Sequence, residues 1–244
     1  MPKKYEIYPV RDRNSKKVIK KDNIFDLPNR LLFVAKTGQG KGVQIANYIL
    51  RPEFYANDID GEDIYIFNPN MRETKTQMII KQKKIPNENL FNGLDNESLG
   101  AVLDFIQEQY QEREENKEPQ KHSLIIIDDC MPNMKDNKNG AFQDLFIRSR
   151  HFQCSVWATV QFYNKCPPVC RNNVNGLVVF EVNTKQLEDI EMDHNYIKEG
   201  KKKFKELYYK AVSPSKHSTF IINYTNPKKK MYLDSNFEEI NIDE

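Results

Sequence analysis

Leu31-Leu32-Phe33-Val34-Ala35-Lys36-Thr37-Gly38-Gln39-Gly40-Lys41-Gly42 is the stretch that decides the fold of this chain. Its first five residues, 31–35, are apolar and predict a buried strand. Glycines and a lysine follow at once. A helical pattern then runs to about Leu50, with Val43, Ala46, Ile49 and Leu50 on one face. The order strand, glycine-rich loop, helix predicts an α/β domain with a binding loop at the carboxyl end of the strand.

This order is the layout of a P-loop, in which backbone N–H groups and a helix N-terminus cradle phosphate oxygens. Lys41 would reach the β- and γ-phosphates as a point charge. The predicted nucleotide-binding residues are Ala35, Lys36, Thr37, Gly38, Gln39, Gly40, Lys41, Gly42 and Val43. The alternative interpretation is a tight strand-to-helix turn that binds nothing.

The match to G-x-x-x-x-G-K-[ST] is imperfect at both ends. Ala35 replaces the first glycine, which is a mild change because a small residue can still turn there. Gly42 replaces the hydroxyl residue that normally binds magnesium, and this change removes a metal ligand.

At 244 residues the chain is long enough for one substantial α/β domain. We expect a basic N-terminal arm over residues 1–28 and a P-loop domain, with a C-terminal β hairpin, over residues 29–244. No apolar run approaches the ~18 residues of a membrane span, and the polar, lysine-rich N-terminus does not resemble a signal peptide. The sequence therefore predicts no membrane association.

Positive charge gathers in three places although the formal net charge is only +2. The first is residues 1–21, the second is residues 198–205, and the third is residues 228–230. Such runs are usually solvated faces, but three of them also fit contact with a polyanion, and composition does not choose between these interpretations.

The four cysteines do not suggest a disulfide framework. Cys130 and Cys154 adjoin apolar strands and are expected to be buried thiols. Cys166 and Cys170, with His151 upstream, suggest a zinc site, but no second pair completes four ligands. This cysteine use is typical of a reducing compartment.

Further apolar runs predict strands at 64–67, 123–127, 154–160 and 177–182. Between them, helical patterns predict helices beginning with a cap at Ser98, at 141–148 and at 185–194. Residues 218–222 and 231–233 predict a hairpin. Strands alternating with helices indicate a mostly parallel central sheet flanked by helices, with the ligand at the carboxyl ends of the strands.

Paired acids follow one of these strands. Asp128 is placed to hold magnesium through its water shell, and Asp129 to polarise an attacking water. Gln161, at the end of the next strand, can touch both the γ-phosphate and the water, and so sense the nucleotide state. Acids often simply end a strand, but acids downstream of a P-loop lysine predict nucleotide hydrolysis.

A longer pattern resembles a known family. It comprises Arg150-His151, a strand, Gln161, Pro167-Pro168 and Arg171-Asn172-Asn173 before the strand 177–182. The pattern is similar to that of genome-packaging ATPases of large DNA viruses and virophages, in the FtsK–HerA superfamily of P-loop ATPases. The resemblance runs from about Leu31 to Val182, and loosely to the hairpin within 220–237. It implies the RecA- and FtsK-like form of a P-loop NTPase.

The resemblance implies a ring-forming ATPase, expected to be a hexamer, that uses ATP and Mg²⁺ to pump double-stranded DNA into a preformed capsid. It implies Lys41, Asp129, Gln161 and Arg171 as catalytic residues, with Asp128 as the metal acid. Arg171 would act as an arginine finger on the nucleotide of a neighbouring subunit, and Arg150 and Arg148 are the further candidates for this role. The alternative is that Arg171 is an ordinary surface arginine without a functional role. Expected partners are a capsid or portal component, and the expected location is a cytoplasmic virus factory or the virion.

Two departures favour another class of function. Gly42 withdraws a metal ligand, and Asp129 is shorter than the glutamate often found at its position in that family. A nucleotide-binding scaffold for DNA or capsid, with little hydrolysis, is therefore the main alternative. A small-molecule kinase ranks last because it leaves the basic clusters unexplained. On the packaging hypothesis, Lys135 and Lys138, after the acids, would face the DNA channel.

Overall fold

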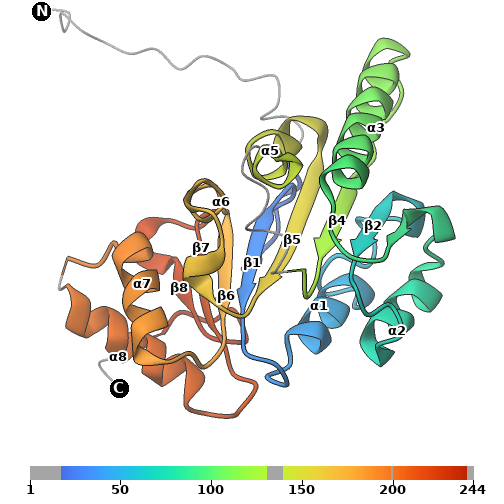
Figure 1. Cartoon of the computed structure of the whole chain (residues 1–244). Helices are drawn as coiled ribbons and strands as arrows, with labels where there is room; N and C mark the ends of the chain where they lie inside the picture. The colour runs from blue at the N-terminus through green and yellow to red at the C-terminus, as the bar shows by residue number, and fades with distance from the viewer. Residues whose placement is uncertain (1–17, 131–139, 199, 241–244) are drawn as a thin grey trace, which may run out of the picture.

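The computed structural model describes residues 18–130, 140–198 and 200–240. Within them, one 8-stranded sheet has the order β3-β2-β4-β5-β1-β6-β7-β8 (Figure 1). The strands from β3 to β6 in this order run parallel, whereas β7 pairs antiparallel with β6 and with β8. The predicted mostly parallel sheet with a C-terminal hairpin is therefore confirmed.

The strands are short and carry few polar residues. They are β1 (Arg30–Val34), β2 (Ile64–Phe67), β3 (Leu90–Phe91), β4 (Ser123–Ile127), β5 (Cys154–Val160), β6 (Gly176–Val179), β7 (Phe220–Asn223) and β8 (Tyr232–Leu233). In the centre, Val34 of β1 pairs with Val160 of β5, and Ile127 of β4 pairs with Ala158. The carboxyl ends of these three strands thus meet at one edge of the sheet.

Helices cover both faces, as Figure 1 shows. One face carries α1 (Lys41–Leu50) and α2 (Thr74–Lys83). The other carries α3 (Asn96–Glu115), α5 (Ala141–Arg148), α6 (Pro168–Asn172), α7 (Thr184–His194) and α8 (Lys201–Val212). Leu32 packs into the core on the α3–α8 face, and its neighbour Phe33 packs into the core on the α1 face. Apolar contact on both faces fixes the end of β1, from which the P-loop leaves.

Several predicted details are wrong. Ser98 does not cap α3; the N-cap is Asp95, whose carboxylate accepts the Ser98 N–H. Val43 is 48% exposed rather than on the buried face of α1, where Ile45 and Tyr48 are buried instead. Helix α8 was not predicted because its lysines conceal a buried stripe, which consists of Phe204, Leu207, Tyr208 and Ala211.

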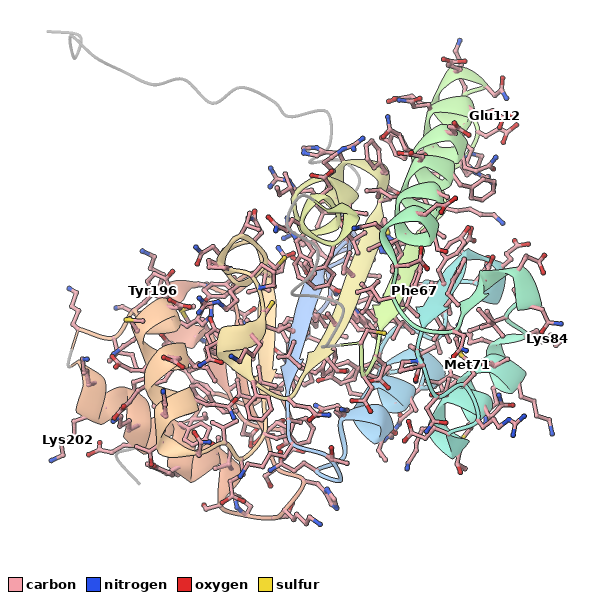
Figure 2. The ribbon with its side chains drawn as sticks, viewed as in Figure 1. Phe67, Met71, Lys84, Glu112, Tyr196 and Lys202 are labelled. Carbon is pink, nitrogen blue, oxygen red and sulfur yellow. The ribbon has the colours of Figure 1, made fainter. Side chains whose placement is uncertain are left out.

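The described end of the basic arm packs on the domain, because Phe25 and Leu27 are fully buried. Residues 1–17 lie outside the described residues, as do Lys135 and Lys138. Figure 2 shows Glu112 on α3 and Lys202 on α8 at opposite ends of the molecule. Across the described residues, no helix combines the length and apolar character that crossing a bilayer requires.

Candidate phosphate-binding and hydrolysis site

The loop after β1 presents backbone N–H groups at the start of α1. Gly38 and Gly40 have φ angles of 79° and 107°, a region that favours glycine. Gly40 is the N-cap of α1, and within the described chain no side chain caps this helix. The first-turn N–H groups, together with the positive end of the helix dipole, therefore form a site suited to an anion.

The buried side chain of Gln39 stabilises this loop through hydrogen bonds. Its Oε1 accepts a hydrogen bond from Lys36 N at 2.6 Å, and its Nε2 donates to the Glu181 carbonyl at 2.8 Å. From the turn before β7, His217 Nδ1 donates to the Gln39 carbonyl at 2.8 Å. The loop is thus tied to the end of β6 and to the hairpin, which explains why Gln39 is buried although Gly38 before it is exposed.

Three of the predicted site residues meet at the carboxyl edge of the sheet. Lys41 Nζ lies 2.6 Å from Asp129 Oδ1, and Gln161 Nε2 donates to the same oxygen at 3.3 Å. These residues come from α1 and from the ends of β4 and β5, which are adjacent through the pairing of β1, β4 and β5. A lysine, a carboxylate and an amide therefore face one small volume beside the anion-binding loop.

Thr159 orients both acids. Its hydroxyl donates to Asp128 Oδ1 at 2.6 Å and accepts the Asp129 N–H at 3.1 Å. Asp129 has φ of 53°, an uncommon angle for a residue with a side chain. Asn68, after β2, donates to Asp128 Oδ2 at 3.4 Å. Because of this geometry, Asp128 points inward and Asp129 toward Lys41.

The two acids differ electrostatically. Burial raises the pKa of Asp128 above its ordinary value, although the Thr159 hydroxyl and the charge of Lys41 oppose this shift. Burial also opposes ionisation of Asp129, but the hydrogen bond and charge of Lys41, with the Gln161 hydrogen bond, outweigh it and lower the pKa of Asp129. Asp129 is therefore the more readily ionised of the pair.

The donor set suits a hard cation. Magnesium takes oxygen ligands and usually binds through one or two carboxylates plus substrate phosphates. Asp128 supplies a buried carboxylate, and it lines a small cavity together with Gly42 and Thr76. The residues present therefore fit a magnesium ion held between Asp128 and a phosphate group.

Arg171 lies apart from this group. It forms an ion pair with Asp193, and its guanidinium lies 4.8 Å from the centre of the Tyr163 ring. Arg171 on α6 and Arg150 both precede a strand, so they lie toward the amino edge of the sheet, whereas Lys41 follows the carboxyl end of β1. Figure 1 shows α6 and α1 at opposite edges of the sheet. Neither arginine is positioned to serve the phosphate loop of its own chain.

A groove of about 580 Å³ runs from the phosphate loop along α1. Gly40 of the loop lines it, as do Val43 and Asn47 of α1. Aromatic residues line much of the rest, namely Tyr48, Phe54, Phe180 and Phe237. The groove lies on the β6–β7 side of the loop, whereas Asp128 and Asp129 lie on the β4 side. Its position explains the exposure of Val43.

Sequence reasoning missed Thr159, Asn68 and His217. Thr159 is the penultimate residue of a predicted strand whose neighbour ends in the acids, so parallel pairing of these strands would have indicated it. The contacts of Asn68 and His217 arise between segments far apart in the chain, and no local pattern marks them.

The chain matches a family model described as Poxvirus A32 protein over residues 16–235. Among solved structures, it is similar to the genome packaging NTPase B204 from Sulfolobus turreted icosahedral virus 2 in complex with AMP. That similarity has a TM-score of 0.53 and 15% identity over 81% of this chain and 93% of that one. EssC (ATPases 2 and 3) from Geobacillus thermodenitrificans has a TM-score of 0.53 and 13% identity, with 80% and 37% coverage. At these identities the likeness concerns the fold. No curated protein matches the chain significantly.

Proposed function

This chain belongs to the poxvirus A32 protein family, whose members are ATPases, and from that premise we propose that it is the ATP-driven motor that moves double-stranded DNA into a viral capsid. The observation that carries the proposal is the convergence of Lys41, Asp129 and Gln161 beside the phosphate loop. A strand-to-helix turn that binds nothing would not require these three side chains to meet.

The geometry supports one orientation for ATP. The terminal phosphates belong beside Lys41 and the acids, on the β4 side of the loop. The sugar and base then leave on the other side, into the groove along α1, where aromatic rings offer apolar contact. The terminal phosphate is thereby the part of the nucleotide closest to the carboxylates.

Each residue has a distinct role in this proposal. Lys41 stabilises negative charge on the transferring phosphoryl group. Asp129, ionised and held by Gln161, orients and polarises the attacking water. Asp128 holds Mg²⁺, which, when bound, neutralises charge on the β- and γ-phosphate oxygens.

Gln161 is suited to report the nucleotide state. It touches Asp129, and two residues later Tyr163 donates its backbone N–H to Gln186 of α7. The Tyr163 hydroxyl in turn donates to Asp193, the partner of Arg171. The short segment 161–163 therefore connects the hydrolysis site, at Gln161, with the ion pair of the proposed arginine finger, at Tyr163.

Arg171 and the exposed lysines bear on assembly and on DNA contact. Because Arg171 lies toward the sheet edge opposite Lys41, it can reach a nucleotide only in a neighbouring subunit, which supports a ring, proposed to be a hexamer. Lys228, Lys229 and Lys230 are exposed and suit a polyanion. The α8 lysines suit it less, because Lys201 and Lys205 pair with acids of α7. A capsid or portal component is the further proposed partner, in an infected cell or virion.

Steady-state ATP hydrolysis with and without double-stranded DNA tests the proposal. A motor hydrolyses ATP faster on DNA, regardless of base composition, and the stimulation weakens as salt rises because phosphate contacts release counterions. Hydrolysis that ignores DNA at low salt would contradict the motor.

The nucleotide-binding scaffold is the second candidate, and Gly42 is the observation that favours it. A scaffold binds ATP and DNA but turns over little, and DNA does not change its rate. The same assay therefore separates the two candidates.

A further inference from the structure

Position 42 of the phosphate loop has room for a side chain, although a glycine is found there. Its φ lies outside the left-handed region, and a Cβ built there would meet Glu73 Oε1 at 3.7 Å and Lys75 Cβ at 3.8 Å, which are ordinary contacts. Neither backbone strain nor lack of space therefore explains why position 42 has no side chain. The atom nearest to this Cβ position is a carboxylate oxygen, that of Glu73.

Glu73 reaches this position from a different element. It is the N-cap residue of α2, which packs against α1. In Figure 2 the chain passes from Phe67, at the end of β2, by Met71 to α2. The Glu73 side chain is 34% exposed, and its carboxylate lies 3.3 Å from Lys75 Nζ. Glu73 is thus held beside the loop without being sealed from a ligand.

Asp128 approaches the same position from the sheet. Gly42, Lys75 and Asp128 line one small cavity between α1, α2 and β4. Two acids from separate elements therefore flank the residue where a P-loop normally carries a hydroxyl.

We propose that Glu73 replaces the missing P-loop hydroxyl and, with Asp128, holds the magnesium ion of the bound nucleotide, directly or through a metal-bound water. This inference rests on the proposed nucleotide site. A carboxylate so close to the phosphates repels them unless a cation lies between, so its position makes nucleotide binding strongly dependent on the metal. Oxygen ligands of this charge suit magnesium.

The test measures binding, not turnover. The Mg²⁺ concentration that gives half-maximal binding of the ATP analogue AMPPCP is determined by calorimetry for the whole chain and for Glu73→Gln. The variant should need at least about tenfold more Mg²⁺, because changing residues around a metal site typically costs that much metal affinity. In EDTA it should bind AMPPCP at least as tightly as the parent, because a negative charge near the phosphates is gone.

Restoring the hydroxyl provides the decisive comparison. Gly42→Thr in the Glu73→Gln background should return the Mg²⁺ requirement toward the parental value, which a role confined to capping α2 would not produce. Glu97→Gln, in the first turn of α3, is the matched control and should titrate like the parent. If Glu73→Gln is poorly folded by circular dichroism, Glu73→Asp, with the same charge but a shorter side chain, replaces it and should also raise the requirement.

The possible failures are distinguishable. If the parent binds AMPPCP with Mg²⁺ but the Glu73 variant titrates like it, or if the threonine brings no rescue, then Glu73 serves only α2 and Lys75, and this inference is overturned. If the parent does not bind AMPPCP at any Mg²⁺ concentration, the proposed function itself fails.

Discussion

Lys41 Nζ lies 2.6 Å from Asp129 Oδ1, so the lysine of the phosphate loop and the second acid after β4 form an ion pair across the site. The lysine side chain is 11% exposed and the aspartate 42%, so the pair lies at the mouth of the site rather than in the core. An incoming phosphate must share or displace this carboxylate. Binding therefore alters the environment of the residue proposed to act on water.

Replacing Lys41 by alanine should weaken ATP binding and reduce hydrolysis by orders of magnitude, because the charge that stabilises the transferring phosphoryl group is lost. Nucleotide binding by calorimetry and phosphate release measure the two effects. Lys81→Ala, which removes an exposed lysine in the last turn of α2 and outside the proposed site, is the control and should change both much less. Parental hydrolysis by Lys41→Ala would show that residues 35–42 are not a phosphate site.

The two acids should give different phenotypes. Asp129→Asn frees Lys41 and keeps the side-chain size, so ATP should bind at least as tightly while hydrolysis fails. Asp128→Asn should instead raise the Mg²⁺ concentration needed for nucleotide binding, because a buried carboxylate near the metal is lost. Magnesium titrations of binding and of hydrolysis compare them. Identical phenotypes would contradict the proposed division of roles.

Thr159→Val should impair the site although Thr159 is 1% exposed and is not proposed to touch nucleotide. Valine keeps the shape but loses the hydroxyl that orients both acids, and a hydrogen bond to a charged group contributes about 2 kcal/mol. We expect a higher Mg²⁺ requirement and slower hydrolysis, with Thr159→Ser close to the parent. Equal impairment by serine would indicate that packing of the methyl group, not the hydroxyl, matters.

Acid should destabilise the fold through buried histidines. Burial lowers the pKa of His122, and likewise of His194, from 6.5 to about 4. The unfolded chain therefore takes up these protons first as pH falls, so stability is unaffected above pH 6.5 and is lost between pH 6.5 and about 4. Each histidine accounts for up to about 3 kcal/mol at the acid end.

Denaturant unfolding at several pH values measures this loss. His122→Gln should flatten the dependence of the unfolding free energy on pH between 6.5 and 4, with His194 responsible for what remains. An unchanged slope in the variant would exclude His122 as a source of acid sensitivity.

The sheet was predictable because its strands are apolar runs with clear ends. Residues 154–160 and 141–148 form a strand and a helix with the predicted bounds. Helix α8 also has apolar residues at helical spacing, namely Phe204, Leu207 and Tyr208. Its run of lysines, however, is equally typical of a solvated surface, so the sequence does not predict the helix. β3 has two residues and too little pattern to detect.

The sequence predicts those contacts of the candidate site that depend only on the parallel strands. Residues that follow parallel strands meet at one sheet edge, so the meeting of Lys41, Asp129 and Gln161 follows from the sequence once the strands are assigned. The contact between Glu73 and Gly42 does not, because it depends on how α2 packs on α1. The ion pair of Arg171 with Asp193 likewise depends on the placement of α7.

A DNA motor uses ATP hydrolysis to move along the duplex, and displacement of a triplex-forming oligonucleotide from a linear duplex reports that movement. The parental chain should release the oligonucleotide when ATP is present, at a rate independent of base composition in the intervening duplex. AMPPCP in place of ATP, or Lys41→Ala with ATP, should leave it bound. If the chain binds the duplex and hydrolyses ATP but releases no more oligonucleotide than these two controls, it is not a DNA translocase.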